Sequence, residues 1–281
     1  MFFYIIIFLV LLAVFFWWEN NAIYTTRIPF YSKTLPLGFD GFTVVQLSDI
    51  HGKVFGKEHC RLIPKIAAAK PDIIVITGDL ADKRHTDISA AFELVQLIKP
   101  LAPVYYVCGN HEARMADYPA FAATLEQIGI KVLCNNALVL KKSGACIDLM
   151  GIEDPVFWQE PCTRYSQTTA DKISDAITKV KKTCLTPFQL ALFHQPDYFA
   201  VFAKHTVDLV LCGHAHGGQF RLPFIGGLCA PSQGLFPKYT AGLYRQGFSQ
   251  MIVSRGLGPS IIPLRLFNRP DLVIITLNTQ K

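Results

Sequence analysis

Residues 207–218 read VDLVLCGHAHGG, an apolar run that ends in two histidines set between glycines. The run is short and β-branched, which predicts a buried strand rather than a helix. Alternate residues of an extended segment point the same way, so His214 and His216 could converge on one spot. A surface turn with two incidental histidines is the alternative, because a short motif by itself has a real false-positive rate.

The same pattern, an apolar run followed by polar residues and a helical stretch, recurs along the chain. Alternating strands and helices predict an α/β architecture. We expect strands at 42–47, 72–77, 103–108, 132–140, 145–152, 189–194, 207–212, 250–254 and 271–277. We expect helices at 57–69, 87–99, 117–129, 171–182 and 197–205, the first shortened or kinked by Pro64.

Polar side chains stand where five of these strands end. Open α/β sheets bind ligands at the carboxyl ends of their strands, so these side chains could share one rim. Taken singly, a Gly-Asp pair is most often a turn, and a lone histidine is most often structural. Five of the eight histidines fall in this set, whereas His59, His85 and His205 do not and are expected at the surface. The set comprises Asp49 and His51 in SDIH, Asp79 in GDL, Asn110 and His111 in GNHE, His194 in FHQP, and the GHAH pair.

The mixed nitrogen and oxygen donors suit divalent ions such as Mn, Fe, Zn or Co. Seven candidate ligands are too many for one tetrahedral site and suit two ions that share a carboxylate. Two divalent ions carry more positive charge than two aspartates neutralise, so net positive charge remains at the site to bind a phosphate group. His111 is then free to donate a proton or to stabilise charge on the phosphoryl group. The candidate ligands are Asp49, His51, Asp79, Asn110, His194, His214 and His216.

In this order the blocks DIH, GDL, GNHE, H and GHAH resemble the signature of the calcineurin-like metallophosphoesterase superfamily. The resemblance implies a central β-sandwich flanked by helices, a four-layer α/β/β/α fold. It implies two divalent metal ions, with Mn²⁺ as the first choice and Fe or Zn as alternatives. Asp79 would bridge them, and His111 matches the family's catalytic histidine. One ion would take Asp49, His51 and His216, and the other would take Asn110, His194 and His214.

Residues 1–18, MFFYIIIFLVLLAVFFWW, contain no charged side chain and are long enough to cross a bilayer. A cleaved signal peptide is the alternative, but no basic residue precedes the run and no small-residue cleavage site follows it. We therefore expect a single-pass membrane anchor, a linker at 19–41 and a catalytic domain at 42–281. Arg27 and Lys33 follow the anchor, which favours a cytoplasmic domain.

The C-terminal stretch 253–277 resembles a membrane-anchored bacterial subgroup that includes phosphodiesterases and enzymes similar to UDP-2,3-diacylglucosamine hydrolases of lipid A synthesis. That resemblance predicts a lipid-linked or nucleotide-sugar phosphate as substrate, with a membrane as partner and no nucleic acid. A broader phosphodiesterase or phosphatase is the alternative, and a tethered binding protein with a vestigial metal site is a third. The run IIPLRLF at 261–267, with Arg255, Arg265 and Arg269, could face lipid and phosphate, or form a buried edge with solvated arginines. Oligomeric state is not indicated.

Overall fold

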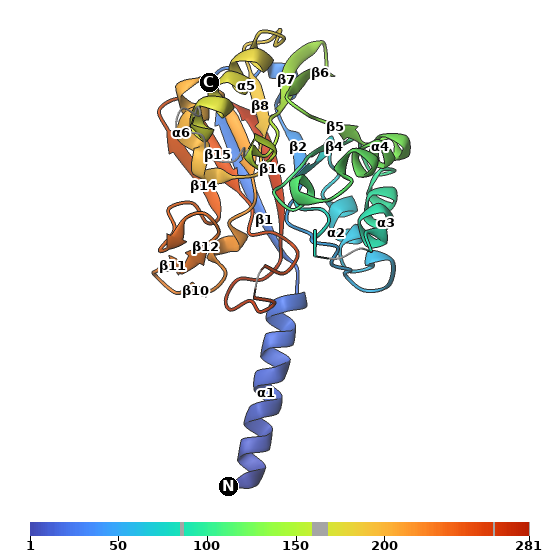
Figure 1. The fold of residues 1–281 in the computed structure, drawn as a ribbon, viewed down its shortest axis with the longest axis vertical. Coiled ribbons are helices and arrows are strands. Elements are labelled where there is room, and N and C mark those ends of the chain that lie inside the picture. Colours follow the sequence, from blue (N-terminus) through green and yellow to red (C-terminus); the bar gives the residue numbers. More distant parts are fainter. Residues whose placement is uncertain (85–86, 159–167, 261, 281) are drawn as a thin grey trace.

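A computed structural model describes residues 1–84, 87–158, 168–260 and 262–280. Two six-stranded sheets form the body of the molecule (Figure 1). The first has the order β1 (Tyr24–Ser32), β16 (Asp271–Thr279), β2 (Phe42–Leu47), β3 (Ile73–Thr77), β4 (Val104–Val107), β5 (Lys131–Val132). The second has the order β14 (Gly242–Gln246), β15 (Ser249–Val253), β9 (Leu209–Cys212), β8 (Gln189–Leu192), β7 (Ala145–Gly151), β6 (Asn136–Lys142).

The two sheets pack face to face, and this is why their strands appear in the sequence as continuous apolar runs. In β3, Ile73 and Val75 point into the core between the sheets, whereas Ile74 and Ile76 point to the outer face. Both faces are buried, so the apolar and polar alternation of a half-exposed strand is absent.

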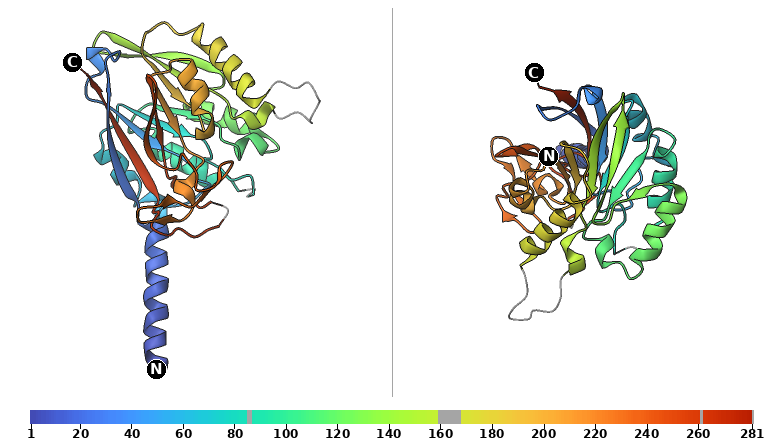
Figure 2. Two further views of the ribbon diagram at one scale, coloured as in Figure 1. Left: turned by 90° about the vertical axis from the view of Figure 1, so that its left-hand side faces the viewer. Right: turned by 90° about the horizontal axis from the view of Figure 1, so that it is seen from above.

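Helices cover the outer face of each sheet (Figure 2). Their apolar side chains join the outer cores, which gives the layers α/β/β/α and confirms the predicted fold class. Pro64 lies in the first turn of α2, and that helix is shorter than expected. The first sheet carries α2 (Ile63–Ala68), α3 (Ser89–Ile98) and α4 (Tyr118–Ile128), and the second carries α5 (Thr169–Lys181) and α6 (Phe199–Lys204). Short 3₁₀ turns occur at η1 (Leu37–Phe39), η2 (Lys57–His59), η3 (Glu112–Arg114), η4 (Pro155–Trp158), η5 (Pro196–Tyr198) and η6 (His216–Gly218).

Two expectations about the strands were wrong, and several short strands were missed. Residues 19–41 are not a linker, because they contain β1, an edge strand that pairs in parallel with β16. Pro29 made this strand hard to predict, because proline within a strand is tolerated mainly at a sheet edge and weakens the strand pattern. The expected strand 132–140 is in fact β5 and β6, which belong to different sheets. The edge strand β14 and the short hairpins β10–β11 (Arg221–Leu222, Gly226–Gly227) and β12–β13 (Cys229–Ala230, Gly234–Leu235) were not foreseen.

Helix α1 (Phe2–Asn21) projects from the domain as a single rod (Figure 1). Its length and its mean hydropathy of 2.4 are sufficient for a membrane span. The last turn of α1 contacts the domain. The Glu19 carboxylate accepts a hydrogen bond from the backbone amide of Asn268 at 3.0 Å, and the Lys53 ammonium donates to the backbone carbonyl of Asn20. The helix therefore ends in a defined contact rather than in a flexible tether.

The direction of the strands decides where α1 meets the domain. Strand β1 follows α1 and runs parallel to β16, which is antiparallel to β2. The beginning of β1 therefore lies at the carboxyl ends of β2, β3 and β4, which are parallel to one another. Helix α1 enters the domain at the sheet edge where the sequence places its polar motifs.

Arg265 fastens the C-terminal loop at this edge. Its guanidinium is buried and donates to the carbonyls of Arg255, Gly256, Gly258 and Asn268, at distances of 2.6 to 3.2 Å. The expectation of a substrate-facing or solvated arginine was wrong for this residue. Its partners are backbone oxygens three to ten residues away in the same loop, and a backbone acceptor leaves no residue type that a motif could reveal.

Arg265→Lys should lower the free energy of unfolding by ~2–4 kcal/mol, because a lysine ammonium cannot reach four carbonyls from one planar group. Urea titration of the full chain in detergent measures this loss. Arg245→Lys is the matched control, because Arg245 lies exposed on β14. Equal midpoints for the two variants would contradict the role given to Arg265.

Candidate metal centre

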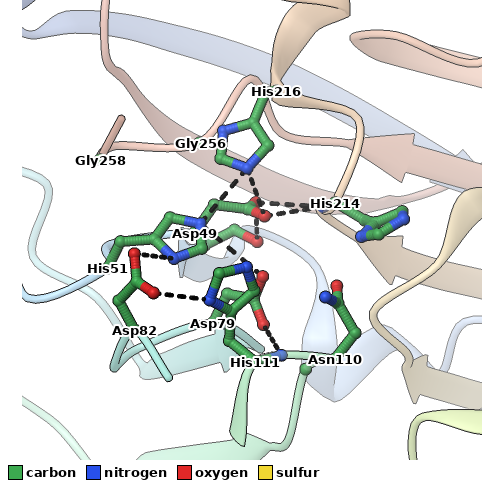
Figure 3. A network of polar contacts seen from close by, with 12 residues as sticks. Asp49, His51, Asp79, Asp82, Asn110, His111, His214, His216, Gly256 and Gly258 are labelled. Atoms are coloured by element: carbon green, nitrogen blue, oxygen red, sulfur yellow. Dashed lines mark hydrogen bonds and ion pairs between the residues drawn. The ribbon is translucent and has the colours of Figure 1, made fainter. Parts of the chain in front are cut away.

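The structure brings all seven predicted ligands and His111 together at the carboxyl ends of β2, β3, β4, β8 and β9. Their side chains point toward one another from separate loops (Figure 3 shows most of them). Burial is nearly complete: Asp49 and His194 are 0% exposed, and His51, His214 and His216 are 5–6% exposed. Such a concentration of polar groups in a core needs compensation by charge or hydrogen bonds.

The first group consists of Asp49, His51 and His216, whose ligand atoms lie within 4.8 Å of one another. The Nε2 atoms of His51 and His216 are 3.3 Å apart, and His216 Nε2 is 3.5 Å from Asp49 Oδ1. The Nδ1 atoms of both rings are buried without a hydrogen-bond partner among the described residues. Two imidazole nitrogens and a carboxylate that face the same point form a donor set for a divalent cation.

The second group consists of Asp79, His194 and His214. His194 Nε2 is 3.3 Å from Asp79 Oδ2 and 3.1 Å from Asn110 Oδ1. On the other side of the ring, His194 Nδ1 donates to the Thr77 carbonyl at 2.8 Å. This bond directs Nε2 into the site, as the outer hydrogen bond of a metal-binding histidine usually does.

Asp79 stands between the two groups. Its Oδ2 lies 3.7 Å from His51 Nε2 and 3.3 Å from His194 Nε2, while its Oδ1 accepts a hydrogen bond from the His111 amide at 2.9 Å. One carboxylate is thus within reach of both donor sets. This is the position that a shared ligand of two ions requires.

The backbone at these positions is strained. Asp49, His51, Asp79, His214 and His216 all have φ between 45° and 65°, a region that non-glycine residues rarely adopt. Such strain persists where the surrounding structure imposes it and concentrates at functional sites. It turns successive side chains of one loop in different directions, so His214 and His216 belong to different groups.

Glycines permit the loops to approach each other. A β-carbon at Gly213 would collide with the Ser48 hydroxyl and the Asp49 carboxylate, and one at Gly109 would collide with the Asp79 carboxylate. The glycines of GHAH and GNHE are therefore needed for close contact between strand ends as well as for turns.

The protonation states of the buried histidines favour cation binding. Burial lowers the pKa of His51 to about 4 and that of His214 to about 3, and it also lowers the pKa of His216. At neutral pH these rings are uncharged, with lone pairs available to a metal. Burial alone would lower the pKa of His194, but Asp79 and Asp49 raise it well above its ordinary value. A bound cation would replace the proton that His194 carries between these aspartates.

His111 contacts an aspartate that the sequence argument missed. His111 Nδ1 lies 2.9 Å from Asp82 Oδ1, and the Arg84 guanidinium binds the same carboxylate. Burial opposes the charge on Asp82, but the Arg84 hydrogen bonds and the nearby histidines hold its pKa below the usual range. The charged carboxylate orients the ring and leaves Nε2 free for a substrate. GDLADKR does hint at this pair, because Asp82 follows Asp79 by three residues in one loop.

A cavity of ≈ 240 Å³ opens over the two groups. Lys83 and Arg84 supply positive charge at its wall, and Pro231 and Ser260 also line it. Other lining residues are His51, Asp79, Asn110, His111, His214 and His216. A phosphate group in this cavity would contact candidate metal ligands, His111 and cationic side chains together.

Glu112, the last residue of GNHE, holds the loops after β3 and β4 together. Its buried carboxylate accepts hydrogen bonds from the amides of Asp79, Ala81 and Gly109 at 2.9 to 3.0 Å. Burial, with the Asp79 charge as the next cause, raises the pKa of Glu112 to about 8. The sequence argument gave this residue no role, because backbone partners leave no trace in a motif.

Glu112→Gln should destabilise the fold by ~1–3 kcal/mol, because the amide group would face backbone N–H groups that need an acceptor. Thermal unfolding of the full chain in detergent checks this value. Glu126→Gln, at an exposed position of α4, is the control. Identical melting temperatures would show that these hydrogen bonds do not hold the loops.

The histidines outside the motifs behave differently from the expectation. His59 is completely buried, not at the surface, and neither ring nitrogen has a hydrogen-bond partner among the described residues. It packs near Phe55, and burial lowers its pKa. His205 is half-buried and pairs with Ser174, whereas His85 lies outside the described residues.

Comparison with known proteins agrees with this geometry. The sequence profile of the calcineurin-like phosphoesterase family matches residues 42–218. YkuE of Bacillus subtilis, described as an uncharacterized metallophosphoesterase, is 32% identical over 93% of this chain and 87% of its own length. The phosphodiesterase YaeI of Escherichia coli is 31% identical over 74% of this chain and 71% of its own length. A zebrafish transmembrane protein with a metallophosphoesterase domain is 31% identical over 86% of this chain and 54% of its own length. The chain therefore belongs to the calcineurin-like phosphoesterase family and is a metal-dependent phosphoester hydrolase.

Proposed function

We propose that this chain is a membrane-anchored two-metal hydrolase that cleaves the pyrophosphate of UDP-2,3-diacylglucosamine to 2,3-diacylglucosamine 1-phosphate and UMP, a step of lipid A synthesis. Water adds its oxygen to one phosphorus, and the bridging oxygen leaves with the other. Two divalent ions, Mn²⁺ in the first place, would supply Lewis acidity toward the phosphoryl oxygens and the attacking water. Asp49, His51 and His216 would hold one of them, Asn110, His194 and His214 the other, and Asp79 both.

His111 would protonate the leaving oxygen from Nε2. Its Nδ1 is engaged by Asp82 at 2.9 Å, which fixes the orientation of the ring. The ring also lines the cavity, at the side where Lys83 and Arg84 lie. These cations would bind the phosphate that is not attacked, as charged donors commonly bind phosphate oxygens.

The contact between α1 and the candidate metal centre is the observation that favours a lipid-linked substrate. The backbone amide of Asn268 donates to Glu19 at the end of α1, and the side-chain amide of Asn268 donates to the His216 carbonyl at 2.7 Å. One residue therefore links the apolar helix to a candidate metal ligand. A water-soluble substrate needs no such closeness to a membrane, whereas a phosphate carried by two acyl chains must be reached at the membrane surface.

The membrane location rests on α1 and on the name of the zebrafish relative as a transmembrane protein. We place the anchor in a bacterial inner membrane and the domain on its cytoplasmic side, because Arg27 and Lys33 follow the helix. The unit that carries catalysis then begins at β1 rather than at residue 42.

The test uses full-length protein in detergent, loaded with Mn²⁺, with UDP-2,3-diacylglucosamine and bis-p-nitrophenyl phosphate as parallel substrates and Asp79→Ala as the blank. Release of UMP at a kcat/KM well above that for the generic diester supports the lipid assignment. Cleavage of the generic diester alone rejects it and favours a broader phosphodiesterase, the activity named for the Escherichia coli relative. Bound metal without turnover of either substrate would favour a tethered metal-binding protein.

A further inference from the structure

Among the described residues, six large apolar side chains are exposed on the short hairpins β10 to β13 and on the segment before β16, at the end of the domain where α1 enters. Their exposure runs from 48% for Ile262 to full exposure for Phe224. We call this set the apolar rim: Phe224, Ile225, Leu235, Phe236, Ile262 and Phe267. The segments that carry them, around β10 to β13 and before β16, lie beside the base of α1 (Figures 1 and 2).

The loops of the apolar rim are joined by backbone hydrogen bonds. The Arg221 amide donates to the Leu266 carbonyl at 3.0 Å, which ties the hairpin that presents Phe224 to the segment that presents Phe267. The Phe236 amide donates to the Leu228 carbonyl at 2.9 Å and ties the next hairpin to the first. The exposed side chains therefore form one structured surface rather than separate loose tips.

Contact with α1 gives the depth of this surface. The rings of Phe267 and Phe15 pack edge to face with centroids 6.0 Å apart. Phe15 lies on the apolar side of Trp17 and Trp18, by roughly 3–5 Å at the helical rise per residue. If these tryptophans mark the membrane interface, Phe267 lies below it, among acyl chains.

Two arginine side chains contact the tryptophans at the end of α1. The Arg269 guanidinium stacks 4.4 Å from the Trp18 ring, and that of Arg61 lies 5.9 Å from the Trp17 ring. Cations above an apolar surface are the arrangement found where a protein rests on an anionic bilayer.

Two other exposed apolar side chains of the described residues lie far from the apolar rim. Leu185 and Phe248 precede β8 and β15, so they lie at the opposite end of these strands from the metal centre. The Gln250 side chain donates to the Tyr31 carbonyl, near the far end of β1 from α1. Isolated apolar residues of this kind are normal on a soluble surface.

We propose that the apolar rim inserts into the same membrane leaflet that α1 enters, so that the domain is held at the surface at several points rather than by one helix. The rim also borders the catalytic cavity, because Pro231 and Ser260 of its loops line that cavity. A lipid phosphate could then enter while its acyl chains stay in the leaflet. The insertion depends on α1 being a membrane anchor, part of the proposed function, but not on the identity of the substrate.

Photo-crosslinking tests the insertion directly. The photoreactive analogue p-benzoylphenylalanine is introduced at Phe224, Phe236 or Phe248 of the full chain, reconstituted into vesicles of phosphatidylethanolamine and phosphatidylglycerol. Phe248 is the matched control, an aromatic residue that is 51% exposed at the far end. After irradiation, mass spectrometry should find at least about tenfold more lipid adduct at positions 224 and 236 than at 248, as expected for side chains within the acyl region.

Two results would overturn the proposal. Adducts at 224 and 236 no higher than at 248 would mean that the rim stays in water. Crosslinks from 224 and 236 to a second copy of the chain would make the rim a dimer interface instead.

A kinetic experiment separates this inference from the substrate assignment. Phe224→Ser combined with Phe236→Ser should leave kcat/KM for soluble bis-p-nitrophenyl phosphate unchanged, but lower the rate on vesicle-borne UDP-2,3-diacylglucosamine about tenfold or more. Phe248→Ser should change neither rate. An equal fall on both substrates would show damage to the fold and contradict the insertion. If the acylated substrate is not cleaved at all while lipid adducts form, the substrate assignment fails and the inserted rim stands.

Discussion

Asp79→Ala is expected to remove both metal ions and to lower phosphodiester hydrolysis to background, a loss on the order of 10⁴-fold or more. The Asp79 carboxylate lies within 3.7 Å of His51 Nε2 and within 3.3 Å of His194 Nε2, so its removal takes a negative ligand from both groups at once. Elemental analysis of the purified chain measures the metal content, and bis-p-nitrophenyl phosphate measures the activity.

Asp87→Ala is the control for this experiment. Asp87 is an exposed aspartate that follows the same strand, outside the cavity. It should keep two ions per chain and full activity. A variant at Asp79 that retained both ions, or lost only one, would contradict the shared position assigned to this carboxylate.

His111→Ala is expected to keep its metal ions and to lose about 10²- to 10⁴-fold in kcat, the usual contribution of a positioned acid. Its ring pairs with Asp82 and belongs neither to the group of Asp49, His51 and His216 nor to that of Asp79, His194 and His214, although it forms a third cluster with His51 and Asp82. The loss should depend on the leaving group, because p-nitrophenolate leaves without help from an acid whereas an alkoxide does not. Rates on aryl and alkyl phosphodiesters, compared for wild type and variant, measure this dependence.

The variant Asp82→Asn shows how much of the His111 contribution depends on the charge that orients its ring and how much on the ring itself. The amide keeps the shape but not the charge, so it should lower kcat less than His111→Ala and leave the metal content intact. Equal loss of metal in His111→Ala and Asp79→Ala would contradict the separate roles given to these two residues. Equal losses on aryl and alkyl esters would remove His111 from the protonation step.

The sequence determined the strands of the central layers and the order of the polar residues that follow them. Buried strands such as β2 and β3 need apolar side chains on both faces, and this requirement is visible among neighbours in the chain. The helices were found within two residues of their ends, except α2, which begins at Ile63 rather than at residue 57. Edge strands such as β1 bury less, tolerate proline and carry a weaker pattern, so β1 was mistaken for a linker.

Only the tertiary structure decided how the polar residues meet. Sheet pairing brings Asp49 and His216, 167 residues apart in the chain, to within 3.5 Å, and it adds Asp82 and Glu112, which the motifs left without a role. It also buries the Arg265 guanidinium among backbone carbonyls of its own loop, whose folded path no side-chain motif records. Periodicity records what each residue requires of its neighbours, whereas a site depends on which strand ends adjoin. That is settled by the packing of the two sheets as a whole.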